Sequence, residues 1–186
     1  MESQQDTGSK LGLGVMKALI LDPHPLGRSM LSHALQQIGL GTIDSCASRA
    51  SALDKLQESK TDVLVMDWSD QHAAPETIRL LRSRHSPNRY VPIIVASAVR
   101  EASAVLDARD AGMSELFLKP FTVETVRSRV VSVLAKPRAF VESPVYFGPD
   151  RRRRGAGFDG NDRCRINAAR LPPTLSAQAG SGRVRY

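Results

Sequence analysis

Residues 62–68 read Asp-Val-Leu-Val-Met-Asp-Trp, a continuous apolar run that ends on an aspartate and a tryptophan. Three similar runs flank it: residues 17–22 (Lys-Ala-Leu-Ile-Leu-Asp), 91–98 (Val-Pro-Ile-Ile-Val-Ala-Ser-Ala) and 116–122 (Leu-Phe-Leu-Lys-Pro-Phe-Thr). Apolar runs without alternation are typical of strands buried on both faces, as in a parallel sheet covered by helices. The pattern predicts an α/β fold.

Segments with helical spacing lie between these strands. We expect strands near 17–22, 42–46, 62–67, 91–97 and 114–119, and helices near 26–38, 48–58, 75–84, 101–111 and 123–135. Strict alternation of this kind predicts a doubly wound (βα)5 domain with a five-stranded parallel sheet, because right-handed crossovers place helices on both faces. Ligands of such sheets bind beyond the carboxyl ends of the strands.

Four polar residues fall at those ends: Asp22, Asp67, Ser97 and Lys119. Each has an ordinary structural interpretation by itself, since an aspartate after a strand commonly caps the next helix. Together, at one edge of a sheet, they favour a phosphoacceptor pocket. A carboxylate can attack a phosphoryl group, and a lysine with a divalent cation would neutralise the charge that two anions bring together.

In this order the four motifs resemble the receiver domain of bacterial two-component response regulators, a flavodoxin-like fold, over residues 16–135. The polar residues follow one another at steps of 45, 30 and 22 positions. The resemblance implies that Asp67 accepts a phosphoryl group from a histidine kinase or a histidine phosphotransfer protein. It also implies that Lys119 and the hydroxyl of Ser97 contact that group, and that the bond from Lys119 to Pro120 is cis.

The same resemblance implies a Mg²⁺ ion bound by Asp22, Asp67 and the backbone carbonyl of Ser69. Receiver domains normally carry two adjacent acids after the first strand, whereas in this chain Pro23 follows Asp22. Mg²⁺ requires a near-octahedral shell of oxygens and often keeps several waters, so water can replace the missing ligand but not its charge. We expect weakened Mg²⁺ binding and slower phosphorylation rather than inactivity.

Two nearby residues bear on this loss of charge. Asp70, three positions after Asp67, could restore some of it, although its loop position makes direct ligation the less favoured interpretation. His24 is close to Asp22 along the chain, but a hard cation avoids imidazole where oxygen is available. We therefore interpret His24 as a residue of the rim or of the start of the next helix.

Signal output in receiver domains commonly involves an aromatic residue three positions before the conserved lysine, and this chain has Leu116 there. Its neighbour Phe117 is expected in the core, so phosphorylation would be transmitted through different packing. By the same resemblance, the downstream protein target would bind the face formed by residues 101–135.

The two ends of the chain differ from its centre. Residues 1–15 are expected to form a flexible leader, or to precede a true start at Met16. Residues 1–135 hold 15 Lys+Arg and 15 Asp+Glu, whereas residues 136–186 hold 11 and 4, so the whole net charge of +7 lies in the second part. We expect 136–186 to be a basic, largely disordered tail.

The tail begins with an apolar and aromatic stretch at residues 140–147. A run of four arginines follows: Arg151, Arg152, Arg153 and Arg154. Residues 155–186 are rich in Gly, Ala, Pro, Ser and Arg without periodicity, which predicts disorder. The arginines would act electrostatically, as a solubilising segment or by docking to an acidic protein, nucleic acid or anionic lipid. A DNA-binding domain is not predicted, because a recognition helix needs its own core.

Cysteine usage and hydropathy indicate the compartment. Cys46, in a predicted strand, and Cys164, in the tail, show no CxxC or paired spacing, which is typical of a reducing cytoplasm. No apolar stretch approaches the roughly 20 residues that span a bilayer, and residues 1–14 lack the apolar centre of a signal peptide. We expect a cytoplasmic protein without a transmembrane segment.

Two classes of function remain open. The first is a single-domain response regulator in a phosphorelay, which accepts phosphate on Asp67 with assisted self-phosphorylation and dephosphorylation and is not a turnover enzyme. The second is a pseudo-receiver, a binding module that keeps the fold and acts through its face and its basic tail. Fluorescence of Trp68, the only tryptophan, would distinguish them by its response to Mg²⁺ and a small phosphodonor.

Overall fold

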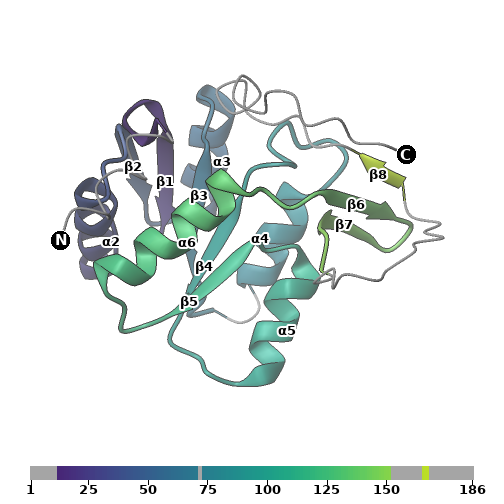
Figure 1. Ribbon diagram of the computed structural model, residues 1–186. Coiled ribbons are helices and arrows are strands. Elements are labelled where there is room, and N and C mark those ends of the chain that lie inside the picture. Colours follow the sequence, from purple (N-terminus) through teal and green to yellow (C-terminus); the bar gives the residue numbers. More distant parts are fainter. Residues whose placement is uncertain (1–11, 71–72, 152–164, 168–186) are drawn as a thin grey trace.

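The computed structural model describes residues 12–70, 73–151 and 165–167 (Figure 1). Within the region up to α6, five strands alternate with five helices, as the sequence predicts. Their bounds are β1 (Lys17–Leu21), α2 (Pro25–Gln37), β2 (Thr42–Cys46), α3 (Arg49–Glu58), β3 (Val63–Asp67), α4 (Ala73–Leu81), β4 (Ile93–Ser97), α5 (Ala102–Ala111), β5 (Glu115–Leu118) and α6 (Val123–Ala135).

The five strands form one parallel sheet in the order β2-β1-β3-β4-β5. The interior strands β3 and β4 are buried along their whole length, whereas the edge strands β2 and β5 are partly exposed. This is the burial that continuous apolar runs predict for a sheet covered on both faces. The predicted doubly wound (βα)5 fold is confirmed.

Apolar layers cover both faces of the sheet. Ile20 and Val65 belong to a cluster with side chains of α2 and α6, whereas their neighbours Leu19 and Leu64 belong to a cluster with side chains of α3, α4 and α5. Successive residues of a strand point to opposite faces, so each strand contributes to both layers. The sheet is therefore buried between two helical layers.

The domain begins earlier than the sequence predicts. Leu13–Val15 form a short 3₁₀ helix, η1, and Leu13 is only 1% exposed in the same cluster as Met16. The N–H of Gly41 donates to the carbonyl of Leu13 at 3.1 Å. The last residues of the predicted leader 1–15 are therefore part of the domain. A single buried leucine has no periodicity by which the sequence could reveal it.

A second, smaller sheet follows α6. Strand β6 (Phe140–Ser143) pairs antiparallel with both β7 (Tyr146–Pro149) and β8 (Arg165–Asn167). The sheet lies on the side of the molecule away from α2, and β7 contacts α5 (Figure 1). Residues 140–149, placed in the tail by the sequence, thus form an ordered hairpin on the domain. The structure describes only β8 of residues 155–186, so their disorder stays a prediction.

Aromatic rings and guanidinium groups hold the β6–β7 hairpin against the domain. Phe140 and Phe147 each make an edge contact with Tyr90, with ring centroids 5.2 and 5.4 Å apart. The Arg89 guanidinium lies 3.6 Å from the centroid of Phe147, and that of Arg82 lies 5.0 Å from the centroid of Phe140. Such contacts add to the stabilisation from the apolar area that the rings bury.

Arg82 is the most buried cation of this contact. Its guanidinium donates to the carbonyls of Arg89 and Val91 at 2.8 Å each and to that of Gly112 at 3.0 Å. Burial lowers the pKa of Arg82 to about 9, so the side chain is still charged near pH 7. One side chain therefore ties the segments before β4 and β5 to the hairpin.

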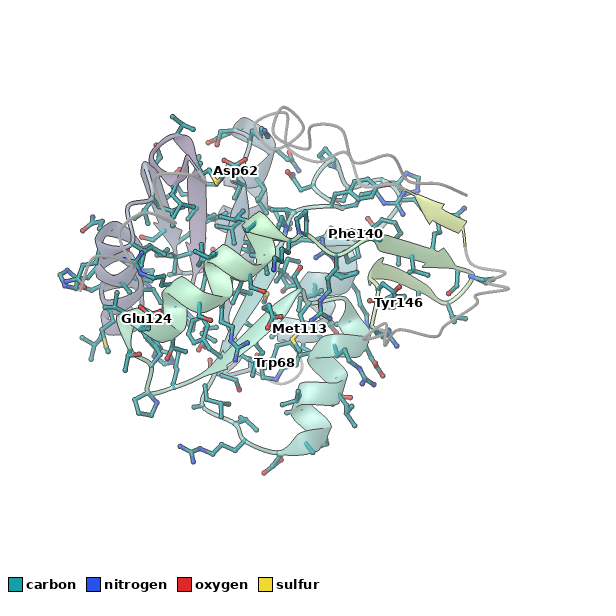
Figure 2. The ribbon with its side chains drawn as sticks, in the orientation of Figure 1. Asp62, Trp68, Met113, Glu124, Phe140 and Tyr146 are labelled. Carbon is teal, nitrogen blue, oxygen red and sulfur yellow. The ribbon has the colours of Figure 1, made fainter. Side chains whose placement is uncertain are left out.

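Arg151, the first of the predicted electrostatic run, is fixed on the domain. Its Nη1 lies 3.0 Å from Asp110 Oδ1, and its guanidinium lies 3.6 Å from the ring centroid of Tyr146, on the hairpin in Figure 2. It belongs to the hairpin contact and not to a solvated tail. Four other residues singled out from the sequence lie outside the described ranges: Arg152, Arg153, Arg154 and Cys164.

Two predictions from composition can be compared with the structure. No helix in the described part of the chain is long and apolar enough to cross a bilayer. Cys46 lies in β2 as a buried free thiol that donates to the carbonyl of Ile20 at 3.5 Å. Burial raises the pKa of Cys46, so this thiol is a poor nucleophile at neutral pH.

We expect Phe140→Ala to lower the free energy of unfolding by about 3 kcal/mol, because it removes a buried ring and leaves a cavity. Phe140 is 5% exposed. Urea unfolding followed by circular dichroism measures the change. The matched control is Val145→Ala at the hairpin tip, 95% exposed, which should change stability by less than about 0.5 kcal/mol. Equally small changes in both variants would contradict this placement of the hairpin.

Candidate functional site

The four polar residues predicted at strand ends lie together at the carboxyl edge of the sheet. Asp67 is the last residue of β3 and pairs with Ala96 of β4, and Ser97 is the last residue of β4. Asp22 follows β1 and Lys119 follows β5. Because parallel strands end on the same side of a sheet, side chains 97 positions apart along the chain can form a hydrogen bond here.

One ammonium group bridges the two carboxylates. Lys119 Nζ lies 2.9 Å from Asp22 Oδ2 and 2.6 Å from Asp67 Oδ1. Asp22 is fully buried and Asp67 nearly so, whereas the lysine side chain is 23% exposed. A buried charge needs a partner, so the lysine allows both carboxylates to be ionised. The peptide bond from Lys119 to Pro120 is cis.

Opposing effects set the ionisation of the site. Burial alone raises the pKa of Asp67, but the hydrogen bonds from Lys119 and Ser69 outweigh it, and the pKa lies below its ordinary value. Burial alone lowers the pKa of Lys119, but its bonds to Asp67 and Asp22 and their charges raise the pKa above its ordinary value. Both shifts favour an anionic Asp67 beside a cationic lysine at neutral pH.

Backbone N–H groups hold the second oxygen of each carboxylate. The N–H of His24 donates to Asp22 Oδ1 at 2.8 Å, and the N–H of Ser69 donates to Asp67 Oδ2 at 3.0 Å. Each carboxylate is therefore fixed by Lys119 on one side and by the backbone on the other. The site is preorganised, because little needs to move before a ligand binds.

Ser97 lies at the adjacent strand end with its hydroxyl turned to its own loop. Its Oγ donates to the carbonyl of Val99 at 3.2 Å and accepts from the N–H of Val99 at 3.0 Å. Among the described residues, no hydrogen bond joins this hydroxyl to Asp67 or Lys119. The predicted contact between Ser97 and a phosphoryl group stays a prediction.

Two residues that the sequence did not single out support Asp22. Arg28 donates to the carbonyl of Asp22 at 2.7 Å. A Cβ on Gly27 would overlap the Asp22 carboxylate, with Asp22 Cγ only 2.8 Å away. A glycine inside a predicted helix costs about 1 kcal/mol relative to alanine, and it can mark a close approach of this kind. A glycine at position 27 was therefore the feature of the sequence that could have indicated this close approach of α2 to Asp22.

Three side chains offer metal ligands at one place. One ligand atom from each of Asp22, His24 and Asp67 lies within 4.8 Å of the other two. The carboxylates are two of the predicted Mg²⁺ ligands, and their oxygens suit that ion. Ligation by the carbonyl of Ser69 stays a prediction. His24 starts α2 as its N-cap and is exposed, as expected, but its ring also belongs to this group.

Asp70 takes part in the start of a helix. Its Oδ1 accepts from the N–H of Ala73 at 2.9 Å, where α4 begins. It is not one of the three side chains that lie together as possible metal ligands. Ligation by Asp70 in place of the carboxylate absent at Pro23 stays the less favoured prediction.

The residues next to the site are packed as the sequence predicts. Phe117 is 2% exposed and makes an edge contact with Phe121 at a centroid distance of 5.2 Å. Leu116 packs against the opposite apolar layer, which contains Trp68. Trp68 is 1% exposed directly after Asp67, so its fluorescence is well placed to report changes at the site.

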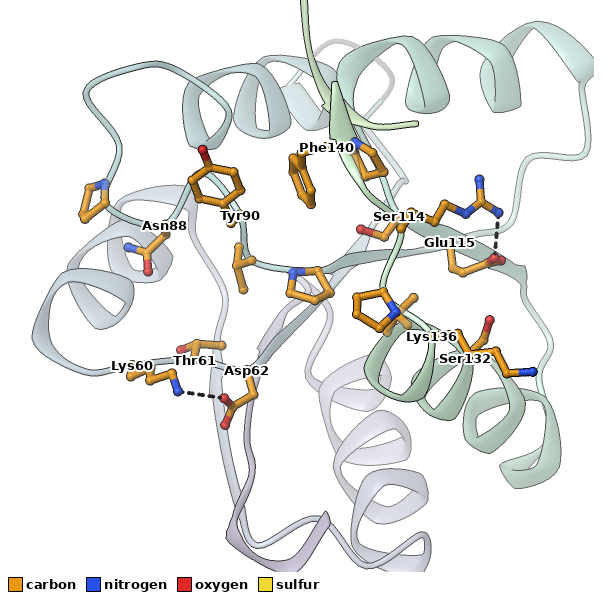
Figure 3. A pocket seen from close by; sticks show the side chains of 17 residues that line it. Lys60, Thr61, Asp62, Asn88, Tyr90, Ser114, Glu115, Ser132, Lys136 and Phe140 are labelled. Carbon is orange, nitrogen blue, oxygen red and sulfur yellow. Dashed lines mark hydrogen bonds and ion pairs between the residues drawn. The ribbon is translucent and has the colours of Figure 1, made fainter. Parts of the chain in front are cut away.

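The site is distinct from a cavity of about 180 Å³ at the other end of the sheet (Figure 3). Asp62, Pro92 and Ser114, which precede β3, β4 and β5, line it together with Tyr90 and Phe140. None of the predicted site residues lines this cavity. The four polar residues at strand ends instead form a largely buried cluster at the carboxyl edge, where the Lys119 side chain is the most exposed member.

We expect Gly27→Ala to weaken Mg²⁺ binding by about tenfold, because the new Cβ displaces the carboxylate of Asp22. Isothermal titration calorimetry with Mg²⁺ measures the affinity. Gly14→Ala is the matched control, since a Cβ there meets nothing within 4 Å. An unchanged affinity in Gly27→Ala would show that the position of Asp22 does not control the cation.

We expect Lys119→Met to lower the free energy of unfolding at pH 7 by about 3 kcal/mol, because it leaves two buried carboxylates without their cation. The pKa of Asp67 is lowered in the fold, so the ion pair stabilises above the ordinary aspartate pKa and is lost as pH falls below about 4. The effect of the substitution should therefore shrink at pH 3 in urea unfolding.

The control is Lys60→Met, which removes an exposed partner 3.6 Å from Asp62 and should cost less than about 1 kcal/mol. A loss in Lys119→Met that is equal at pH 7 and pH 3 would contradict an ionised cluster.

Comparison with known proteins identifies the family. The model of the response regulator receiver domain matches residues 18–131. The chain is 24% identical over 123 residues to the chemotaxis protein CheY of Pseudomonas aeruginosa, covering 65% of this chain and 98% of that protein. It is 27% identical over 124 residues to CheY1 of Helicobacter pylori, covering 64% and 97%.

Solved structures share the fold. A response regulator from Thermotoga maritima superposes with a TM-score of 0.60 at 20% identity, covering 66% of this chain and 99% of that one. The receiver domain of a sensor histidine kinase from Pseudomonas aeruginosa, with magnesium coordinated in its active-site cleft, gives 0.56 at 20% identity, with coverages of 66% and 99%. With its sheet order and a family match over more than half its length, the chain belongs to the response regulator receiver domains of two-component signalling.

Proposed function

We propose that the protein is a single-domain response regulator that accepts a phosphoryl group on Asp67 and passes the signal on by protein–protein contact. The observation that carries this proposal is the ammonium of Lys119, 2.6 Å from Asp67 and 2.9 Å from Asp22. It keeps the nucleophile ionised and supplies positive charge where phosphoryl oxygens would arrive.

In the proposed reaction, an oxygen of Asp67 attacks the phosphorus of a phosphohistidine on a kinase or phosphotransfer protein. The new O–P bond makes an acyl phosphate, while the P–N bond breaks and the partner's imidazole leaves with the bonding electrons. Lys119 gains phosphoryl oxygens as hydrogen-bond acceptors. Ser97 would exchange its bond with Val99 for one to the phosphoryl group.

A divalent cation fits the site, because Asp22 and Asp67 offer the oxygen ligands that Mg²⁺ prefers. The Pseudomonas aeruginosa receiver domain with magnesium in its cleft supports Mg²⁺ as the cation, and the carbonyl of Ser69 would complete the protein ligands. When bound, the cation would neutralise charge on the transferring oxygens. Pro23 leaves the site one carboxylate short of the usual pair, so weakened affinity is part of the proposal.

The protein would act as a phosphoacceptor and not as a turnover enzyme, because the phosphoryl group ends on its own side chain. The downstream target would bind the face of α5, β5 and α6, where Leu106 and Leu118 are exposed apolar side chains. We place this signalling in the cytoplasm. Leu116, in the position of the usual aromatic residue, would transmit the change through aliphatic packing.

We expect the full-length protein to gain one hydroxylamine-labile phosphoryl group from acetyl phosphate in the presence of Mg²⁺. Intact-mass spectrometry detects it, and Trp68 fluorescence follows its rate. Asp67→Asn should take no label, and Ser97→Ala should label about 100- to 1,000-fold more slowly, the scale of one lost transition-state hydrogen-bond donor. Asp54→Asn, an exposed carboxylate of α3, is the matched control and should label as wild type.

Labelling of Asp67→Asn at the wild-type rate would place the phosphoacceptor elsewhere. A wild-type protein that takes no phosphate from acetyl phosphate or from a kinase-containing extract would favour the pseudo-receiver, a module that binds partners without phosphorylation.

A further inference from the structure

We infer that His24 is a ligand of the cation site, so that the site favours a divalent ion of the iron-to-zinc series, which accepts imidazole nitrogen, over a purely oxygen-seeking ion. This inference rests on the cation site of the proposed function and concerns which ion that site selects. It reverses the interpretation of His24 as a residue of the rim alone.

The first support is the position of the ring. A ring nitrogen of His24 and one oxygen from each of Asp22 and Asp67 lie within 4.8 Å of one another. Metal bonds to these atoms are about 2.0 to 2.2 Å long, so two ligands of one ion lie roughly 3 to 4 Å apart. A movement of about an ångström closes the group. The exposed side chain of His24 can make that movement, since no hydrogen bond to its ring is found among the described residues.

The second support is the rigidity of the segment that carries the ring. Residues 22–25 read Asp-Pro-His-Pro, so Asp22 and His24 each precede a proline that restricts their backbone. The N–H of His24 also donates to Asp22 Oδ1 at 2.8 Å. These constraints fix the start of the histidine side chain relative to the carboxylate, which reduces the entropy lost on binding an ion.

The third support is the chemistry of the ligand set. Pro23 cannot donate an oxygen from its side chain, so the group holds two carboxylates and one imidazole. Imidazole suits iron, nickel, copper and zinc, whereas Mg²⁺ is bound through oxygens and waters. The imidazole of His24 can thus replace the carboxylate that is absent at Pro23 when the ion is iron, nickel, copper or zinc, but not when it is Mg²⁺.

Titration of the full-length, tag-free protein with Co²⁺ tests this, because Co²⁺ shows ligand-dependent visible absorption. No phosphodonor is added, and Mg²⁺ is titrated separately by calorimetry. His24→Ala should weaken Co²⁺ binding by about tenfold or more and change the absorption band, the scale expected when a metal site loses a coordinating group. Its Mg²⁺ affinity should change by less than about twofold, because imidazole is not a preferred Mg²⁺ ligand.

Two variants make the result specific. His33→Ala removes a second exposed imidazole of α2, whose Nε2 lies 2.8 Å from Gln37 Nε2, and should leave both affinities unchanged. His24→Asn keeps a favourable N-cap residue, so the helix is preserved while the imidazole is lost, and it should lose Co²⁺ affinity as His24→Ala does.

Wild-type Co²⁺ affinity and absorption in both His24 variants would overturn the inference, as would an equal loss in His33→Ala. The outcome is independent of phosphorylation. If the protein is phosphorylated on Asp67 but binds Co²⁺ without His24, only this inference is contradicted. If it binds Co²⁺ through His24 but is never phosphorylated, only the proposed function is contradicted.

Discussion

Two carboxylates buried at the edge of a sheet cannot both stay ionised without a cation between them, and this constraint organises the site. Asp22 has no exposed surface, and Lys119 Nζ lies 2.9 Å from its carboxylate. The lysine can reach both acids only because β1, β3 and β5 run parallel and end together. Gly27 then follows as a requirement, since α2 begins against the carboxylate and leaves no space for a side chain.

The same constraint explains why Pro23 matters. With Asp22, Asp67 and Lys119 ionised, the cluster carries a net charge of −1 before any cation binds, one unit less negative than with the family's second acid. A divalent ion must then share both carboxylates with an ammonium already 2.6 Å from one of them. Under the proposed ion binding, the affinity would depend less on total charge and more on the chemistry of the third side chain of the group, His24.

The fold and the charged core of the site could be predicted because both follow local rules. Continuous apolar runs indicated buried strands, and parallel strands necessarily bring their carboxyl ends together. The roles of Gly27 and Leu13 were missed because each depends on a tertiary contact and not on a periodic pattern in the sequence. Gly27 lies against the carboxylate of Asp22, and Leu13 packs into a core cluster built by other elements. The orientation of Ser97 toward Val99 was also beyond the sequence, since rotation about one bond decides it.

The hairpin shows the limit of composition more clearly. Its second strand contains Gly148 and Pro149, which are rare in strands, and an arginine run follows it along the chain. For these reasons the sequence predicted that this segment belongs to the tail. Its order comes from rings that pack on Arg82 and Arg89 and from backbone contact at Gly148, where a Cβ would lie 3.0 Å from Gly112. Gly112 directly follows α5, so the hairpin covers the carboxyl end of that helix. Under the proposed function, a partner of the α5–β5–α6 face would therefore contact mainly the earlier turns of α5, on the same side of the domain as Asp67.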